Sequence, residues 1–79
     1  MEIDWLEDFL ALASSGVFAR AAEARNISQS AFTRRIKNLE QWMGTPLFDR
    51  SVHPVVLTQA GDAFRLTAIE TVNSLHKAR

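Results

Sequence analysis

The chain between residues 18 and 44 limits the fold more than any other part of the sequence. Its pattern predicts a short helix over about 18–25, a tight turn, and a second helix that follows Ser28 and ends before Gly44. Serine is a favoured N-cap residue, and a glycine followed closely by Pro46 stops a helix from continuing. Two helices joined by so short a turn predict a helix-turn-helix unit.

The second of these helices has two chemically different faces. Its apolar side chains recur at helical spacing and are Phe32, Ile36, Leu39 and Met43. The opposite face carries amide, hydroxyl, ammonium and guanidinium groups, on Gln29, Ser30, Thr33, Arg34, Lys37 and Gln41. Such a face can read base edges in a major groove, whereas the commoner alternative is an amphipathic helix with a solvated polar side. The polar residues gather at the helix start, which favours DNA because recognition helices direct that end at the bases.

A helix is also predicted before this unit. Apolar residues at helical spacing cover 4–15, with Asp4 as the expected N-cap and Gly16 as the expected stop. The side chains of Glu7 and Asp8 fall off the apolar stripe, so we expect them on the solvated side.

A small β-wing and a final helix are predicted after the unit. The segments 47–50 and 55–57 have strand composition and flank a four-residue loop. Thr58 is a suitable N-cap for a last helix over 59–79. No stop signal follows, which we interpret as the mark of a fragment of a longer protein.

The last helix is apolar on more than one side. One side carries Ala60, Phe64, Ala68 and Leu75, and other sides carry Leu66, Ile69 and Val72. A helix of this kind usually has two partners, here its own domain and a second copy of the chain. The residues expected to form the dimer are Phe64, Ala68, Ile69, Val72 and Leu75.

Composition narrows the functional classes. Seventy-nine residues make one small domain without cysteine, so we expect neither disulfides nor a cysteine metal site. The two histidines, His53 and His76, lie far apart and without neighbouring acids, so no other metal centre and no cofactor are expected. No apolar run approaches the roughly 18 residues of a membrane span, so a soluble, cytoplasmic protein is expected. The formal net charge is zero, but residues 1–15 sum to −4 and residues 16–50 to +3. Positive charge therefore gathers around the helix-turn-helix unit, as phosphate binding requires.

The order and spacing of these features resemble the DNA-binding domain of LysR-type transcriptional regulators. The resemblance spans residues 5–61 without a gap, and the matching residues are Leu6, Phe9, Gly16, Phe18, Ala21, Ala22, Ser28, Gln29, Ile36, Leu39, Glu40, Gly44, Leu47, Phe48, Arg50, Leu57, Thr58, Ala60 and Gly61. It implies a mainly α winged helix-turn-helix domain over 1–58, with three helices and a two-stranded wing, followed by a long linker and dimerisation helix over 59–79. The run 25–32 also resembles the branch that contains the hypochlorite-responsive LysR regulator, and it identifies no effector.

The resemblance implies roles for individual residues. Gln29 corresponds to a residue that reaches base edges, where its amide can pair with adenine. Ser30 stands where the family usually has proline and Thr33 where it usually has serine, and both would face the groove. Arg34 is expected at bases or phosphates, and Lys37, one turn further, at phosphate.

Further candidates for contact with DNA lie around this helix. Arg50 resembles an arginine that is structural or contacts phosphate, and an ion pair with Asp49 or Glu40 is an equal alternative. His53 occupies the wing tip, where many relatives carry an arginine aimed into the minor groove, and the alternative is a loop residue without a role. The expected set is completed by Arg20 and Ser28.

The sequence also departs from the family pattern. Val17 and Ala19 replace the polar residues that cap the short second helix in relatives, which weakens its start by about 1 kcal/mol if a cap is lost. Arg25 replaces a core leucine, so its stem would cover the core while its guanidinium reaches solvent or DNA. Trp5 is expected in the core, and Trp42 is expected to be a half-buried packing residue.

The predicted function is sequence-specific binding of double-stranded DNA by a homodimer on an imperfect palindrome, to control transcription. We expect that the family's C-terminal effector-binding domain is absent from this sequence, so no small-molecule ligand is expected for it. A tetramer is expected only for the full-length protein. The alternative is a protein-interaction or purely dimerising winged-helix module, favoured by the neutral net charge. An enzyme ranks third, because no nucleophile–base pair, carboxylate cluster or phosphate loop is apparent.

Overall fold

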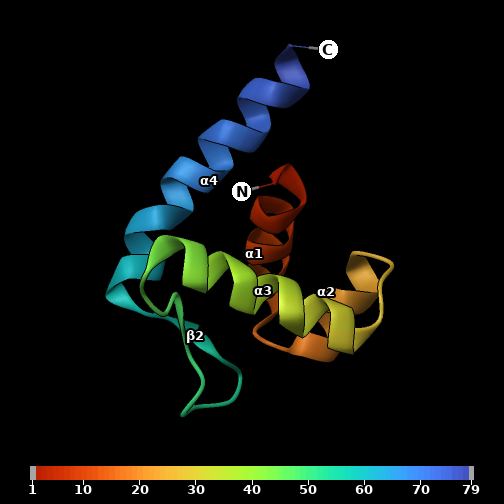
Figure 1. Cartoon of the computed structure of the whole chain (residues 1–79), viewed down its shortest axis with the longest axis vertical. Helices are drawn as coiled ribbons and strands as arrows, with labels where there is room; N and C mark the ends of the chain where they lie inside the picture. Colours follow the sequence, from red (N-terminus) through yellow and green to blue (C-terminus); the bar gives the residue numbers. More distant parts are fainter. Residues whose placement is uncertain (1, 79) are drawn as a thin grey trace.

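Figure 1 shows the computed structural model of the chain, which describes residues 2–78. The elements in chain order are α1 (Ile3–Ser15), α2 (Phe18–Ala24), α3 (Gln29–Met43), β1 (Phe48–Asp49), β2 (Val56–Leu57) and α4 (Gln59–Lys77). The predicted class is confirmed, namely a mainly helical winged helix-turn-helix domain followed by a long helix. No helix among the described residues combines the length and the apolar character that crossing a membrane requires.

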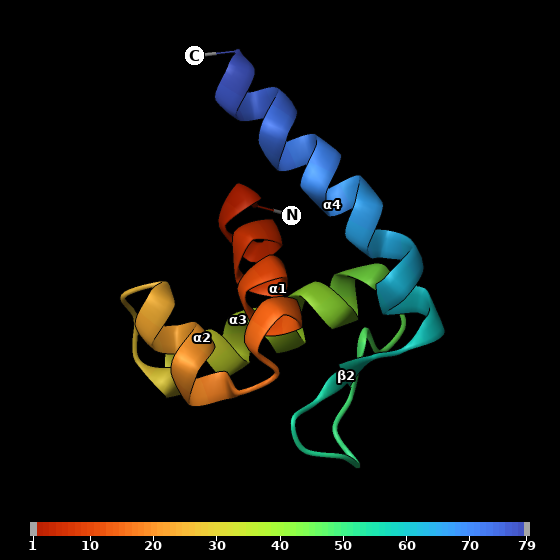
Figure 2. The same ribbon diagram turned by 180° about the vertical axis from the view of Figure 1, so that it is seen from behind.

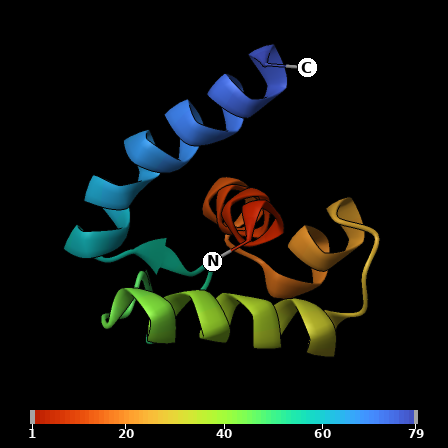
Figure 3. The ribbon, with the colours of Figure 1, turned by 45° about the horizontal axis from the view of Figure 1, so that its top comes forward.

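Helix α1 is the centre of the domain. It packs against α2, α3 and α4, which surround it when it is seen nearly end-on (Figure 3). Its Phe9 is fully buried, with ring centroids 5.3 Å from Phe48 of the wing and 5.2 Å from Phe64 of α4. One aromatic side chain therefore joins the first helix to the wing and to the last helix. Trp5 is partly buried against this core, as predicted.

The helix-turn-helix unit has the expected caps. Arg25 is the C-cap residue of α2, and Asn26 then takes a left-handed conformation with φ 59°, which asparagine tolerates. Ser28 accepts a hydrogen bond from the backbone N–H of Ala31 at 3.2 Å, which confirms it as the N-cap of α3. Gly44 ends α3 with φ 78°. Val17 is the N-cap residue of α2 and provides no side-chain cap, as the departure from the family pattern predicted.

The wing is an antiparallel pair in the register Phe48↔Leu57 and Asp49↔Val56, and each strand is shorter than predicted. The strands are short because the backbone N–H groups of the residues before each strand donate to partners outside the two-stranded sheet. The N–H of Leu47 donates to the Glu40 carboxylate at 2.7 Å, and the N–H of Val55 donates to the carbonyl of Gly16 at 2.9 Å. The second bond ties the wing to the turn between α1 and α2, on the far side from the end of α4 (Figure 2).

The start of α4 is pinned to the base of the wing. Thr58 accepts from the N–H of Gly61 at 3.0 Å, which confirms it as the N-cap, and its hydroxyl donates to the carbonyl of Pro46 at 2.8 Å. Gly61 is buried, and a Cβ atom at this position would collide with the carbonyl of Leu47. This close approach sets where α4 leaves the domain.

Three local predictions are wrong. Glu2, and not Asp4, occupies the N-cap position of α1, and Asp4 lies in the first turn with its carboxylate 3.3 Å from Arg25. Asp8 is not solvated but fully buried. Trp42 is not half-buried but 59% exposed, next to the last residue of α3.

Candidate nucleic-acid interface

The outer side of α3 presents five polar side chains around one open depression. They define the recognition face, which consists of Gln29, Ser30, Thr33, Arg34 and Lys37. All five are exposed, and they come from the first two and a half turns of α3. The structure therefore brings together the candidates that the sequence placed on this helix.

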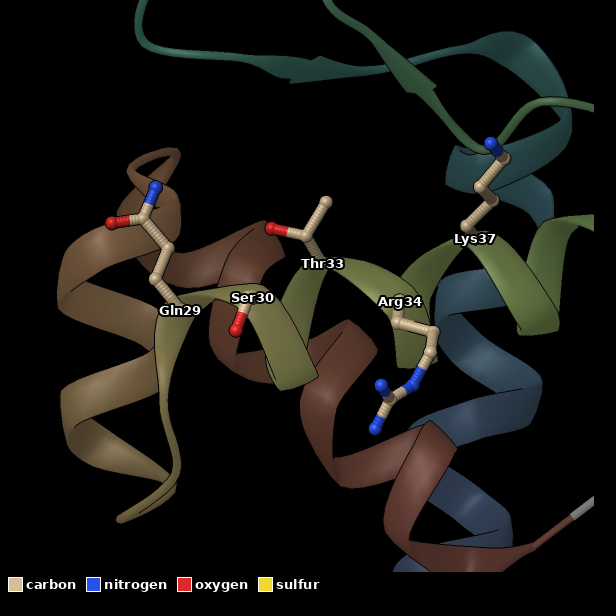
Figure 4. Close-up of a pocket in the computed structure, with 5 residues that line it drawn as sticks. All are labelled: Gln29, Ser30, Thr33, Arg34 and Lys37. Atoms are coloured by element: carbon tan, nitrogen blue, oxygen red, sulfur yellow. The ribbon is translucent and has the colours of Figure 1, made fainter.

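The recognition face has two rows (Figure 4). Gln29, Thr33 and Lys37 point toward the side on which the wing lies, whereas Ser30 and Arg34 point away from it. Because residues four apart lie above one another on a helix, each row runs along the helix axis. An amide, a hydroxyl and an ammonium group thus follow one another on the wing side of α3.

The wing tip approaches the beginning of α3. His53 and Gln29 line one depression, together with Pro54 and the backbone turn at 16–19. His53 is exposed there, as its predicted position at the tip requires. Behind it, Asp49 accepts hydrogen bonds from the hydroxyl and the N–H of Ser51, and these bonds lower the pKa of Asp49 below its ordinary value. The carboxylate thereby holds the turn into the wing loop.

Arg50 contacts residues of the domain itself, a carboxylate and an aromatic ring. Its Nη2 lies 2.9 Å from Oε1 of Glu40, and its guanidinium carbon lies 5.5 Å from the centroid of the Phe18 ring. Of the two predicted ion-pair partners, Glu40 is the one that Arg50 contacts, while Asp49 bonds to Ser51. Arg50 also lines a shallow depression with Lys37, so its exposed side borders the recognition face.

A buried carboxylate connects the helices beneath this face. Asp8 on α1 accepts from Nε of Arg25 at 2.7 Å and from Nε of Arg35 at 2.6 Å. Arg25 also donates to Glu7 at 2.9 Å and to Asp4 at 3.3 Å. These five residues form the Asp8 cluster. Its arrangement corrects the expectation that the Arg25 guanidinium reaches into solvent, because the guanidinium is paired with the acids of α1 and its side chain is only 21% exposed.

The Asp8 cluster keeps both arginines charged. For Arg25, partial burial alone lowers the pKa, but the hydrogen bond to Asp8 and the nearby carboxylates raise it above its ordinary value. For Arg35, the hydrogen bonds to Asp8 dominate and raise the pKa, against a smaller effect of burial. Sequence patterning missed this cluster. The available signals were three acids within five residues of α1, at Asp4, Glu7 and Asp8, and an arginine at position 25 in place of the family's core leucine.

The ion pairs change how the neutral net charge should be understood. Carboxylates engage Arg25, Arg35 and Arg50, all of which face the interior or the wing base. Within residues 2–78, no ion pair engages Arg34 or Lys37 on the recognition face. The acids of these pairs come from α1 and from Glu40 of α3, while Arg34 and Lys37 keep positive charge on the outer face of α3.

The remaining candidates lie apart from the recognition face or at its edge. Arg20 is exposed on α2 and lines a separate depression with Glu23 and Ala24. Ser28 is exposed at the start of α3, and its hydroxyl lies 3.3 Å from that of Ser30. In the part of the chain that the structure describes, no three His, Cys, Asp or Glu residues come together as potential metal ligands.

The residues predicted for dimerisation fall into two groups. Ala68 and Val72 are buried, and Phe64 is partly buried against the core, so α1 and the core already cover them in one chain. Ile69 is partly buried, and Leu75 is 46% exposed. Leu66, which the sequence placed on a further apolar side of this helix but not among the dimerisation residues, is 66% exposed and is the most exposed large apolar side chain of the described residues.

Comparison with known proteins identifies the family. The family described as bacterial regulatory helix-turn-helix protein, lysR family, matches residues 3–62. The HTH-type transcriptional regulator YjiE of Escherichia coli is 48% identical over 64 residues, which are 81% of this chain and 21% of YjiE. The HTH-type transcriptional activator IlvY of Salmonella typhimurium is 39% identical over 79 residues, which are the whole of this chain and 27% of IlvY. The chain thus spans about a quarter of the length of these relatives.

Solved structures show the same fold. The Vibrio fischeri protein DarR, solved in complex with DNA, is 47% identical and superposes with a TM-score of 0.96 over 99% of this chain and 27% of DarR. The BenM DNA-binding domain, solved with the benA site 1 DNA, is 32% identical, with a TM-score of 0.95 over 99% of this chain and 91% of that domain. Since the family match covers most of the described residues and the fold agrees throughout, this chain belongs to the LysR family of bacterial helix-turn-helix regulators.

Proposed function

We propose that this chain is a sequence-specific reader of double-stranded DNA that controls transcription, and that it acts by binding and not by catalysis. The observation that carries the proposal is the recognition face of α3, whose five polar side chains are exposed and share one depression. Support also comes from DarR and the BenM domain, which were solved with DNA and share the fold. Such a role would place the protein in the bacterial cytoplasm.

In this proposal, α3 enters the major groove with its N-terminal turns. Gln29 can donate to and accept from the edge of an adenine, and the methyl group of Thr33 can contact a thymine methyl. Arg34 would bind a guanine or a phosphate, and Lys37 a phosphate one turn further along. Ser28 and Ser30 carry hydroxyls at the same helix end, which suits contacts to the sugar-phosphate backbone.

The wing would contact the neighbouring minor groove. His53 shares a depression with Gln29, so a DNA duplex that meets α3 runs close to the wing tip. A narrow A·T-rich groove has a strongly negative potential that attracts a histidine. Arg50, held by Glu40 on one side, would offer its exposed edge to phosphate, and Arg20 would reach a phosphate beside α2.

The proposal includes a homodimer through α4. Leu66 and Leu75 are exposed on different sides of α4, and Ile69, one turn from Leu66, lines a groove with Leu10 of α1 and the β2 strand. A symmetric pair would place one α3 in each of two major grooves, one helical turn or a multiple of it apart. The preferred site would then be an imperfect palindrome. A tetramer, and a response to an effector, would belong to a longer protein.

Selection of preferred sites from a random duplex library at moderate salt tests the proposal. We expect an enriched two-armed dyad whose arms are related by two-fold symmetry. Enrichment of a single half-site would contradict the dimer but would still support base recognition by α3. An absence of binding at any salt concentration would reject the proposal and favour a protein-interaction module.

A further inference from the structure

The Asp8 carboxylate is fully buried, and both of its oxygens accept hydrogen bonds from arginines of the helix-turn-helix unit. Oδ1 accepts from Nε of Arg25 at 2.7 Å and from Nη2 of Arg35 at 2.8 Å, and Oδ2 accepts from Nε of Arg35 at 2.6 Å. No buried side-chain nitrogen or oxygen among the described residues lacks a partner. The carboxylate therefore makes three short charge-assisted bonds to two arginines.

These two arginines belong to the two halves of the helix-turn-helix unit. Arg25 is the C-cap residue of α2, directly before the turn, and Arg35 lies in the middle of α3. Asp8 thus binds the end of one helix and the centre of the other to one point on α1. Arg35 follows Arg34 in sequence, so its attachment fixes the rotation of α3 about its own axis at the level of the recognition face.

Apolar packing alone constrains this rotation less well. Phe32, Ile36 and Leu39 anchor α3 through non-directional contacts, which tolerate small rotations and shifts. The bidentate interaction between Arg35 and Asp8 requires Nε and Nη2 of the guanidinium to be aligned with the two carboxylate oxygens. Buried ion pairs often contribute little net stability, whereas a role in fixing one arrangement is their best-supported use.

We propose that Asp8 is a positioning residue for sequence recognition, which sets the orientation of α3 through Arg35 and of α2 through Arg25. This inference rests on the proposed function, because it concerns how accurately the recognition face is aimed at base edges. A second consequence follows from charge. Loss of the carboxylate would release the Arg35 guanidinium beside the recognition face, where it could bind any phosphate and strengthen binding to unrelated DNA.

The test uses Asp8→Asn, which keeps the shape of the side chain and removes its charge. Its matched control is Leu12→Ala, which truncates a fully buried apolar residue on the same helix outside the Asp8 cluster. For both variants, the dissociation constants for the selected site and for random duplex are measured well below the temperature of unfolding. We expect Asp8→Asn to reduce the ratio of specific to random affinity about tenfold, the effect of roughly one lost base-pair contact. Leu12→Ala should leave this ratio unchanged.

A second variant covers the case in which Asp8→Asn does not fold. Arg35→Gln leaves Asp8 paired with Arg25 and should also lower the ratio of specific to random affinity. Arg35→Lys keeps the charge but cannot form a bidentate interaction, so its ratio should lie between those of Arg35→Gln and the unmodified chain. The double variant of Asp8→Asn with Arg35→Gln should lose little more than either single variant, because both remove the same bond.

The outcomes separate this inference from the proposed function. If Asp8→Asn, or Arg35→Gln in its place, preserves the ratio as Leu12→Ala does, the Asp8 cluster is only structural and the inference is overturned. If the unmodified chain itself does not distinguish its selected site from random duplex, the proposed function fails first and the inference falls with it.

Discussion

Glu40 holds Arg50 and the beginning of the wing at the same time. Its Oε1 lies 2.9 Å from Nη2 of Arg50, and its Oε2 accepts hydrogen bonds from the N–H groups of Leu47 and Phe48 at 2.7 and 3.2 Å. Glu40 belongs to α3, and its partners belong to the chain that enters the wing. One carboxylate therefore fixes the distance between the proposed major-groove element and the proposed minor-groove element.

Replacing Glu40 by glutamine should destabilise this junction. Glu40→Gln keeps the side-chain shape but weakens bonds to two backbone amides and an arginine. We expect the free energy of unfolding to fall by about 1–3 kcal/mol, measured from urea denaturation. Glu70→Gln, at an exposed position of α4, is the matched control and should have almost no effect. Equal denaturation midpoints for the two variants would show that the junction does not depend on the Glu40 charge.

Gly16 should be more sensitive to alanine than Gly44. Both residues end a helix with positive φ, at 70° and 78°, so alanine costs about 1–2 kcal/mol of backbone strain at either position. At Gly16 an added Cβ would also meet Pro54 of the wing, whereas at Gly44 it meets nothing within 4 Å. We expect Gly16→Ala to lower the thermal midpoint clearly more than Gly44→Ala does. Similar midpoints would mean that the wing moves aside without cost.

Gln29→Ala should relax recognition at one base pair in each half-site. The amide offers a donor and an acceptor to a base edge, and its loss should cost roughly 1–3 kcal/mol at that position only. Affinities for a series of single base-pair variants of the selected site would reveal the position. Gln59→Ala, which removes an exposed amide at the start of α4, should leave the series unchanged. A uniform loss over all sites would contradict a base-reading role for Gln29.

Lys37→Ala should behave differently from Gln29→Ala. An ammonium group on phosphate contributes equally to all sequences, so specific and random binding should weaken together. The slope of log affinity against log salt should decrease by about 1 for each lost phosphate contact. Titrations at three or more salt concentrations measure this slope. An unchanged slope would place Lys37 outside the DNA backbone contact.

Charges on α4 should have different effects on its two sides. Ile69→Glu changes a partly buried residue of the groove beside the exposed Leu66. It should convert a dimer to a monomer in light scattering while preserving helical content by circular dichroism. Val72→Glu places a charge in the core of the same chain and should unfold the domain. If Ile69→Glu remains dimeric, the dimer forms through another surface.

Local signals in the sequence determined the elements of this protein. Ser28 and Thr58 cap their helices as serine and threonine do in general, because the side-chain oxygen satisfies a free backbone N–H within three residues. Gly16 and Gly44 end helices for an equally local reason, since only glycine takes a positive φ without strain. The recognition face was predictable for the same reason, because its five residues follow the periodicity of one helix.

Tertiary structure decided which polar groups meet and which apolar groups stay exposed. Asp8, Arg25 and Arg35 lie on three different helices, and periodicity within each helix says nothing about a carboxylate that accepts bonds from both other helices. Trp42 is mostly exposed and Val72 is buried in the core, although the helical pattern predicted a half-buried Trp42 and a Val72 at the dimer interface. Burial depends on how helices cross, and that crossing is set by contacts between residues far apart in sequence, which no local pattern contains.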